Sequence, residues 1–191
     1  MTSIEPGAEE GDRLRFESCF CEHYADILAF AIRRQPDRQA AEDAASETFA
    51  VAWRRRGLIP DLPLPWLYSI ALRVLANQRR SSLRRRRLEE RLAQEQAIPA
   101  DGSDPTDALA RRGAFAAAYG RLSEDDREIL RLIAWEGLEP RAAAAVLDCS
   151  YSAFRVRLHR ARRRLGKQLA AAGHSTDDVR DTDIKAIEEA R

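Results

Sequence analysis

Residues 137–169, GLEPRAAAAVLDCSYSAFRVRLHRARRRLGKQL, constrain the fold of this chain more than any other stretch. Pro140 is tolerated in the first turn of a helix, and the alanine-rich run after it has high helix propensity. Asp148 and Cys149 interrupt that run, and Ser150 is suited to cap a second helix. The spacing therefore predicts two helices joined by a tight turn.

The second of these predicted helices has two chemically different faces. Its apolar face carries residues at helical spacing, namely Phe154, Leu158, Ala161, Leu165 and Leu169. Its opposite face carries Ser152, Arg155, Val156, His159 and Arg163, with Arg160 at the edge. A DNA-reading helix-turn-helix needs this combination, because arginine contacts both phosphates and guanine edges. The alternative is a solvated, arginine-rich helix in an ordinary helical domain.

Charge is distributed unevenly along the 191 residues, although the formal net charge is only +1. Residues 1–12 carry a net charge of −4 and residues 173–191 a net charge of −3, so the remainder carries +8. Only Lys167 and Lys185 are lysines, and the other basic residues are arginines. A basic body with acidic ends suits a polyanionic partner whose non-specific binding must be limited.

The sequence also indicates the cellular compartment. Its start lacks a basic segment followed by an apolar one, and no apolar run approaches the roughly 20 residues that span a bilayer. Cys19, Cys21 and Cys149 form neither an even disulfide set nor a zinc-binding pattern. We therefore expect a cytoplasmic protein with buried free thiols, the alternative for Cys19 and Cys21 being a redox switch.

Two helices are predicted before residue 57, following an acidic segment, residues 1–12, that we expect to be disordered. The first spans about residues 13–34 and has an apolar stripe of Phe16, Phe20, Tyr24, Ile27, Leu28 and Ala31. The second spans about residues 37–56 and has a core-facing side of Ala41, Ala45, Thr48, Phe49 and Ala52. Its other side is small and acidic and carries Asp43, Ser46, Glu47 and Ala50. Periodicity leaves open whether that side is solvated or docks a partner.

A proline-rich loop is predicted to precede a third helix that begins at Trp66. The loop contains Pro60, Pro63 and Pro65, and the core stripe of the helix is Trp66, Leu67, Ile70 and Val74. Another face of the helix carries Ser69, Arg73, Arg80, Arg84 and Arg87. Such arginine density suits a nucleic-acid backbone. Trp66 and Tyr68 are candidate surfaces for base stacking or, alternatively, core residues.

Residues 94–106 are rich in Pro, Gly, Ser and Asp and predict a flexible linker between two small helical domains, residues 13–93 and 107–172. In the second domain, one helix ends near Tyr119 and Ser123 caps the next. The apolar side of that next helix is Ile129, Leu130, Leu132, Ile133 and Trp135. Neither domain shows strand alternation, so the predicted fold is all-α. The acidic tail, residues 173–191, is predicted to be disordered, the alternative being a weak amphipathic helix.

A series of motifs, in this order and across this linker, resembles the extracytoplasmic-function sigma factors of bacteria. This compact class keeps only the second and fourth sigma regions. The motifs are AEDAASETFAVAW (41–53), PWLYSIALRVLANQRRS (65–81), LSEDDREILRLIAWEGL (122–138) and VLDCSYSAFRVRLHRARRRL (146–165). The resemblance covers about residues 16–169.

The resemblance implies binding to core RNA polymerase, at its β′ clamp and β flap, and to promoter DNA. Asp43, Ser46 and Glu47 match the family's polymerase-binding face. The downstream, minus-ten element and DNA melting would involve residues 58–64 together with Trp66, Arg73, Asn77, Arg80 and Arg84. The upstream, minus-thirty-five element would be read by Ser152, Arg155, Val156, His159, Arg160 and Arg163. Binding energy, without nucleotide hydrolysis, would open the DNA.

An anti-sigma protein is a further partner that the resemblance implies, without insertion of this chain into a membrane. The alternative function is a stand-alone helix-turn-helix transcriptional regulator, which would bind duplex DNA by itself. An enzyme is not predicted, because the sequence lacks a Gly-rich phosphate loop, an HExxH motif and a convergent acidic cluster. We expect no metal and no cofactor.

Overall fold

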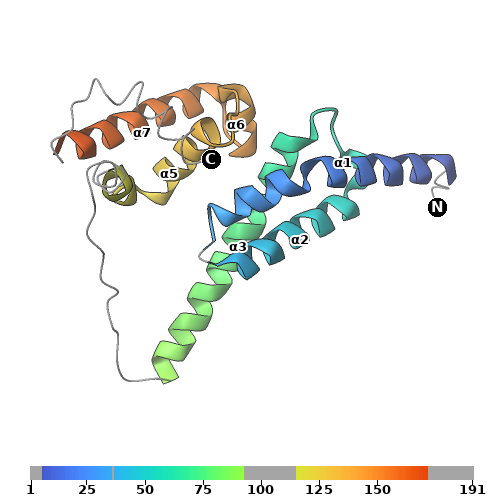
Figure 1. Ribbon diagram of the computed structural model, residues 1–191, viewed down its shortest axis with the longest axis horizontal. Coiled ribbons are helices and arrows are strands. Elements are labelled where there is room, and N and C mark those ends of the chain that lie inside the picture. Colours follow the sequence, from blue (N-terminus) through green and yellow to red (C-terminus); the bar gives the residue numbers. More distant parts are fainter. Residues whose placement is uncertain (1–5, 36, 93–114, 172–191) are drawn as a thin grey trace. The chain divides into compact units, whose positions relative to one another are not determined.

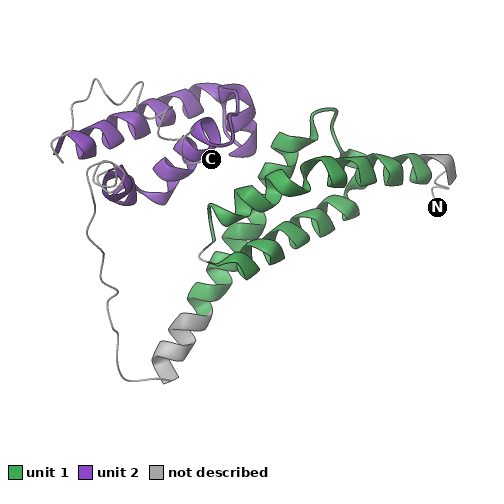
Figure 2. Ribbon diagram, viewed as in Figure 1, with its two compact units in different colours: residues 1–96 green, residues 97–191 purple. Residues whose placement is uncertain are grey.

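The computed structural model describes residues 6–35, 37–92 and 115–171, and side chains within residues 9–35, 37–84 and 115–171. These ranges contain helices and turns but no strand, which confirms the predicted all-α fold. The chain divides into two compact units, residues 1–96 and 97–191 (Figure 2). The predicted linker and tail, residues 94–106 and 173–191, lie outside the described residues. No helix in the described ranges is long and apolar enough to cross a membrane.

Unit 1 consists of α1 (Pro6–Ile32), α2 (Arg38–Arg54) and α3 (Pro63–Leu92), with a short 3-10 helix, η1 (Arg56–Leu58), after α2. The three long helices pack on one another, and α3 continues past the ends of its neighbours (Figure 1). The carboxylate of Asp37 accepts a hydrogen bond from the backbone N–H of Ala40 at 2.7 Å and caps α2. The apolar faces meet in a core that includes Ile27, Phe30, Ala31, Ala41, Ala45, Phe49, Ala52, Leu67, Ile70 and Val74.

Two helix starts differ from the prediction, and both fall on a proline. Helix α1 begins at Pro6, so the expected disorder is wrong for residues 6–12. There Arg13 pairs with Glu10 at 2.6 Å and with Glu17 at 3.4 Å, and these contacts link successive turns. Helix α3 begins at Pro63 and not at Trp66, because the first turn of a helix needs no backbone N–H donors.

Burial in unit 1 corrects one prediction and decides between two alternatives for another residue. Cys19 is buried but Cys21 is exposed, since residues two apart on a helix point to nearly opposite sides. Burial, reinforced by the nearby Glu22, raises the pKa of the Cys19 thiol. Tyr68 is only 3% exposed and stacks on Phe30 with ring centroids 4.5 Å apart. Of the two alternatives given for Tyr68, a core residue and a surface for base stacking, the first is confirmed.

Unit 2 contains a helical segment, residues 115–120, followed by α5 (Glu124–Ala134), α6 (Pro140–Val146) and α7 (Tyr151–Ala171). Ser123 caps α5 by accepting from the N–H of Asp126 at 3.2 Å. Ser150 accepts from the N–H of Ala153, also at 3.2 Å, at the start of α7. Both predicted caps are confirmed. Between α6 and α7, Asp148 adopts a positive φ of 51°, which a short polar side chain tolerates and which tightens the turn.

Contacts between distant residues hold the helices of unit 2 together. Asp126 is 6% exposed, and its two carboxylate oxygens accept hydrogen bonds from Arg164 Nη1 at 2.8 and 2.7 Å, which ties α5 to α7. The Tyr119 hydroxyl donates to the backbone carbonyl of Arg127 at 3.2 Å. Burial raises the pKa of Tyr119 to about 12.

Candidate functional site

The α7 basic face consists of the residues that the sequence placed on one side of the second predicted helix, namely Ser152, Arg155, Val156, His159, Arg160 and Arg163. All of them are exposed, and Val156 is 50% exposed. The opposite side packs on α5 and α6 through buried Phe154, Leu158, Ala161, Leu165 and Leu169. Burial of the apolar side turns the arginines outward, where long cationic side chains can reach a polyanion.

An aromatic residue that the sequence analysis did not select lies at the start of this face. Tyr151 is the first residue of α7 and is 41% exposed. The guanidinium carbon of Arg155 lies 5.8 Å from the centroid of its ring, and that of Arg141 in α6 lies 5.3 Å away. The spacing of four residues between Tyr151 and Arg155 could have indicated the first contact. The contact with α6 depends on how the two helices pack.

The α2 acidic face consists of Asp43, Ser46 and Glu47, and all of them are exposed. Asp43 accepts a hydrogen bond from Gln39 at 3.1 Å, and Glu47 pairs with Arg54 at 3.1 Å. Both interactions are solvent-exposed and contribute little to folding. The face is therefore a surface of α2 that the helix does not need for its own stability.

Trp53 adjoins the α2 acidic face and was missed as a site residue. It follows Ser46 by seven residues, which is two helical turns, and its side chain is 40% exposed. Its ring meets that of Phe16 edge-on, with centroids 5.0 Å apart. The guanidinium carbon of Arg56 lies 4.5 Å from the centroid of the same ring. An exposed indole on the side of α2 that carries Ser46 is typical of protein–protein interfaces, which are enriched in tryptophan and arginine.

The α3 polar face consists of Trp66, Arg73, Asn77, Arg80 and Arg84. All of these are exposed except Trp66, which is half-buried. Arg80 donates to the amide oxygen of Asn77 at 2.6 Å, and Arg84 donates to Ser81 at 3.3 Å. The predicted position of Arg87 falls on α3, but its side chain lies outside the described ones. The face thus presents polar side chains on successive turns of one helix, three of them guanidinium groups.

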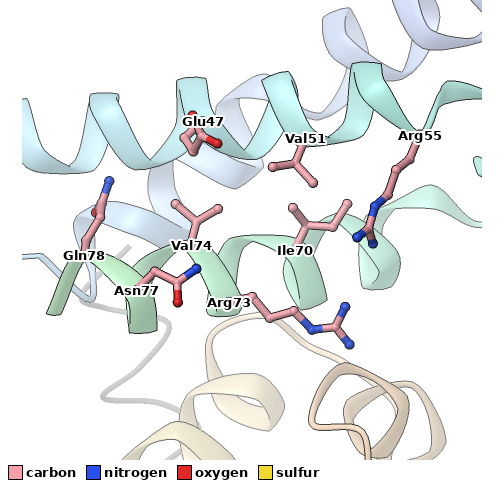
Figure 3. A pocket seen from close by; sticks show the side chains of 8 residues that line it. All are labelled: Glu47, Val51, Arg55, Ile70, Arg73, Val74, Asn77 and Gln78. Atoms are coloured by element: carbon pink, nitrogen blue, oxygen red, sulfur yellow. The ribbon is translucent and has the colours of Figure 1, made fainter. Parts of the chain in front are cut away.

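A groove of about 350 Å³ lies between α2 and α3 and joins two of the predicted surfaces. Glu47 from the α2 acidic face lines it together with Arg73 and Asn77 from the α3 polar face (Figure 3). The remaining lining residues are Val51, Arg55, Ile70, Val74 and Gln78. Aliphatic side chains and polar groups that can donate or accept hydrogen bonds therefore meet in one hollow. Sequence periodicity alone does not place α2 against α3.

The two units match two regions of one protein family. Residues 19–87 match sigma-70 region 2, and residues 112–165 match sigma-70, region 4. The RNA polymerase sigma-E factor of Streptomyces coelicolor is 30% identical over 178 residues, which cover 93% of this chain and 94% of that protein. The ECF RNA polymerase sigma factor SigL of Mycobacterium tuberculosis is 27% identical over 173 residues, covering 87% and 96%.

Solved structures agree with these matches. A chain from the complex of CnrH with the cytosolic domain of CnrY aligns with a TM-score of 0.58 and 27% identity, covering 86% of this chain and 94% of that one. A chain from the complex of the sigma factor RpoE with the anti-sigma factor NepR of Bartonella quintana aligns with a TM-score of 0.53 and 28% identity. The alignment covers 81% of this chain and 96% of that one. With both regions present in order and a sigma factor matching almost its whole length, the chain belongs to the sigma-70 family, as an alternative sigma factor of the extracytoplasmic-function group.

Proposed function

We propose that this sigma factor acts through three surfaces, of which the α2 acidic face binds core RNA polymerase and the other two bind promoter DNA. As a member of its family, the chain directs promoter recognition and transcription initiation by RNA polymerase. The observation that supports this assignment is exposure: the residues selected from the sequence lie on surfaces that the folded units leave open to solvent, apart from half-buried Trp66. Each surface also has a chemistry that suits its partner.

The α2 acidic face suits a positively charged surface of the polymerase, the β′ clamp in the family. Asp43 and Glu47 supply the carboxylates, and Trp53 supplies an adjacent aromatic contact. Complementary charge would speed association and fix the orientation, whereas the indole would contribute most of the buried apolar area. We extend the proposed docking surface to Trp53 for this reason.

The α3 polar face and the groove beside it suit the separated strand of the downstream element. Arg73 and Asn77 line the groove, whose aliphatic wall includes Ile70 and Val74. An unpaired base has an apolar face and polar edges, so a hollow with both kinds of wall fits it. In the part of unit 1 whose side chains are described, Arg55 and Arg73 have no carboxylate partner, which leaves both available to a phosphate.

The α7 basic face suits the upstream element as duplex DNA. Substitution of Arg155 by alanine is expected to weaken recognition of that element by about 1–3 kcal/mol, because one bidentate contact to guanine has that value. The measurement is binding of the holoenzyme to promoter fragments that differ at single upstream positions. A loss confined to one position supports base contact. An equal loss on every fragment would make Arg155 a phosphate contact.

Initiation by this chain would require binding alone, without catalysis by the sigma factor itself, and would take place in the cytoplasm. Two solved relatives are recorded in complexes that involve NepR or CnrY, and NepR is named there as an anti-sigma factor. We extend this to the present chain and propose that an anti-sigma protein binds it. Such a partner would cover one or more of the surfaces that polymerase or DNA needs.

Transcription by purified core polymerase on pooled genomic fragments, with and without the chain, tests the proposed function. Sequencing of the 5′ ends should reveal new start sites that share two spaced upstream elements. The matched control is the chain carrying Asp43→Arg and Glu47→Arg, which should give no new start sites. Absence of new start sites for the unmodified chain, together with tight duplex binding by the chain alone, would instead support a stand-alone regulator.

A further inference from the structure

The ring of Tyr151 bridges the two helices of the helix-turn-helix through a pair of cations. Arg141 reaches it from α6, with its guanidinium carbon 5.3 Å from the ring centroid. Arg155 reaches it from the next turn of α7, at 5.8 Å. Both distances lie within the range of about 6 Å in which the electron-rich face of an aromatic ring attracts a cation. All three side chains are exposed, so these contacts form at the surface of the motif and not in its core.

This arrangement restricts the side chain that is expected to read a base. An arginine with several rotatable bonds loses conformational freedom when it is fixed against DNA, and that loss opposes binding. A bidentate contact to guanine also requires the planar guanidinium to approach in one orientation. A ring that already holds Arg155 near the start of α7 reduces the freedom that binding must remove. The cap from Ser150 to Ala153, at 3.2 Å, fixes the same turn of the backbone.

We propose that Tyr151 is a positioning residue, which orders Arg155 for the upstream promoter element while its ring also engages Arg141 of α6. This inference rests on the proposed function, in which the α7 basic face reads that element. Tyr151 acts through Arg155 and is not itself required to contact a base. The prediction is that base discrimination at the position read by Arg155 depends on an aromatic ring at residue 151.

The test is a double-mutant cycle in the reconstituted holoenzyme, made from the full chain and core polymerase. The probe is a library of promoter fragments, built on a start site found by transcription and randomised across the upstream element. The variants are Tyr151→Leu, Tyr151→Phe, Arg155→Ala and the double change Tyr151→Leu with Arg155→Ala. Leucine keeps apolar bulk at an exposed position but removes the aromatic face, and phenylalanine keeps that face. At each upstream position, the measured quantity is the ratio between the affinity for fragments with the preferred base and the affinity for fragments with the other bases.

We expect Tyr151→Leu to reduce discrimination about two- to fivefold, at the position where Arg155→Ala also reduces it. Tyr151→Phe should retain the discrimination of the unmodified chain. The double change should be no worse than Arg155→Ala alone, because the ring acts only through that arginine. A general loss of packing would not produce this non-additivity.

Three other outcomes would overturn the inference, and the third is distinguishable from the first two. If Arg155→Ala reduces discrimination but Tyr151→Leu leaves it unchanged, or if the two losses add, Tyr151 does not position Arg155. If Arg155→Ala leaves discrimination unchanged at every upstream position, the proposed role of the α7 basic face fails, and the inference fails with it.

Discussion

We expect the paired substitutions Asp43→Arg and Glu47→Arg to abolish binding of this chain to core RNA polymerase, while its helix content stays unchanged. Each change replaces a carboxylate of the α2 acidic face with a guanidinium, so an attractive contact becomes a repulsive one. Like charges brought together at an interface cost several kcal/mol, which corresponds to about a hundredfold or more in affinity. Folding should tolerate the changes, because both side chains are exposed and their partners Gln39 and Arg54 make only surface contacts.

Two measurements test this prediction. Competition with a labelled sigma factor gives the affinity for core polymerase, and circular dichroism of the free chain gives its helix content. Glu22→Arg is the matched control, since it reverses one exposed charge of unit 1 on a different helix, α1. Glu22 alternates with Phe20 and Tyr24, which pack on Phe49 of α2, so its side chain points away from α2. The control should bind normally, and Glu47→Arg alone should be intermediate. Normal binding by the doubly substituted chain would remove the acidic face from the polymerase interface.

Periodicity was sufficient for the features that depend on one helix at a time. The apolar residues of α7, from Phe154 to Leu169, are buried as predicted, because a period of 3.6 fixes which side chains share a face. The caps at Ser123 and Ser150 are also confirmed, because a cap joins a side chain to a backbone N–H only three residues further along the chain. The roles of the exposed residues stay predictions, because exposure alone does not identify a partner.

Sequence reasoning missed or left open the features that depend on contacts between helices. It did not decide whether Tyr68 stacks on a base or lies in the core, and the contact with Phe30 of another helix decides for the core. The groove between α2 and α3, and the contact of Arg141 with Tyr151, each form where two helices pack together, and the pattern of a single helix does not show that packing. The start of α3 was predicted three residues too late, because Pro63 was assigned to the loop, although proline is also well suited to the first turn of a helix.

We expect Phe154→Ala to unfold unit 2 selectively and so separate promoter recognition from polymerase binding. Phe154 has no exposed surface, and it lies on the side of α7 that packs against α5 and α6. Truncation of a buried phenylalanine to alanine costs about 3–5 kcal/mol. A small domain has a free energy of unfolding of only about 5–15 kcal/mol, so this loss removes much of its stability. The α2 acidic face belongs to unit 1 and should still bind polymerase.

Hydrogen–deuterium exchange of the full chain distinguishes the two units in one experiment. The variant should lose protection across α5, α6 and α7, while α1, α2 and α3 exchange as before. Val156→Ala, on the exposed side of the same helix, is the matched control and should change stability by no more than about 0.5 kcal/mol. Upstream discrimination should disappear in Phe154→Ala, and core binding should persist. Loss of protection in both units together would show that they unfold as one cooperative body, and recognition and docking could then not be separated by a core substitution.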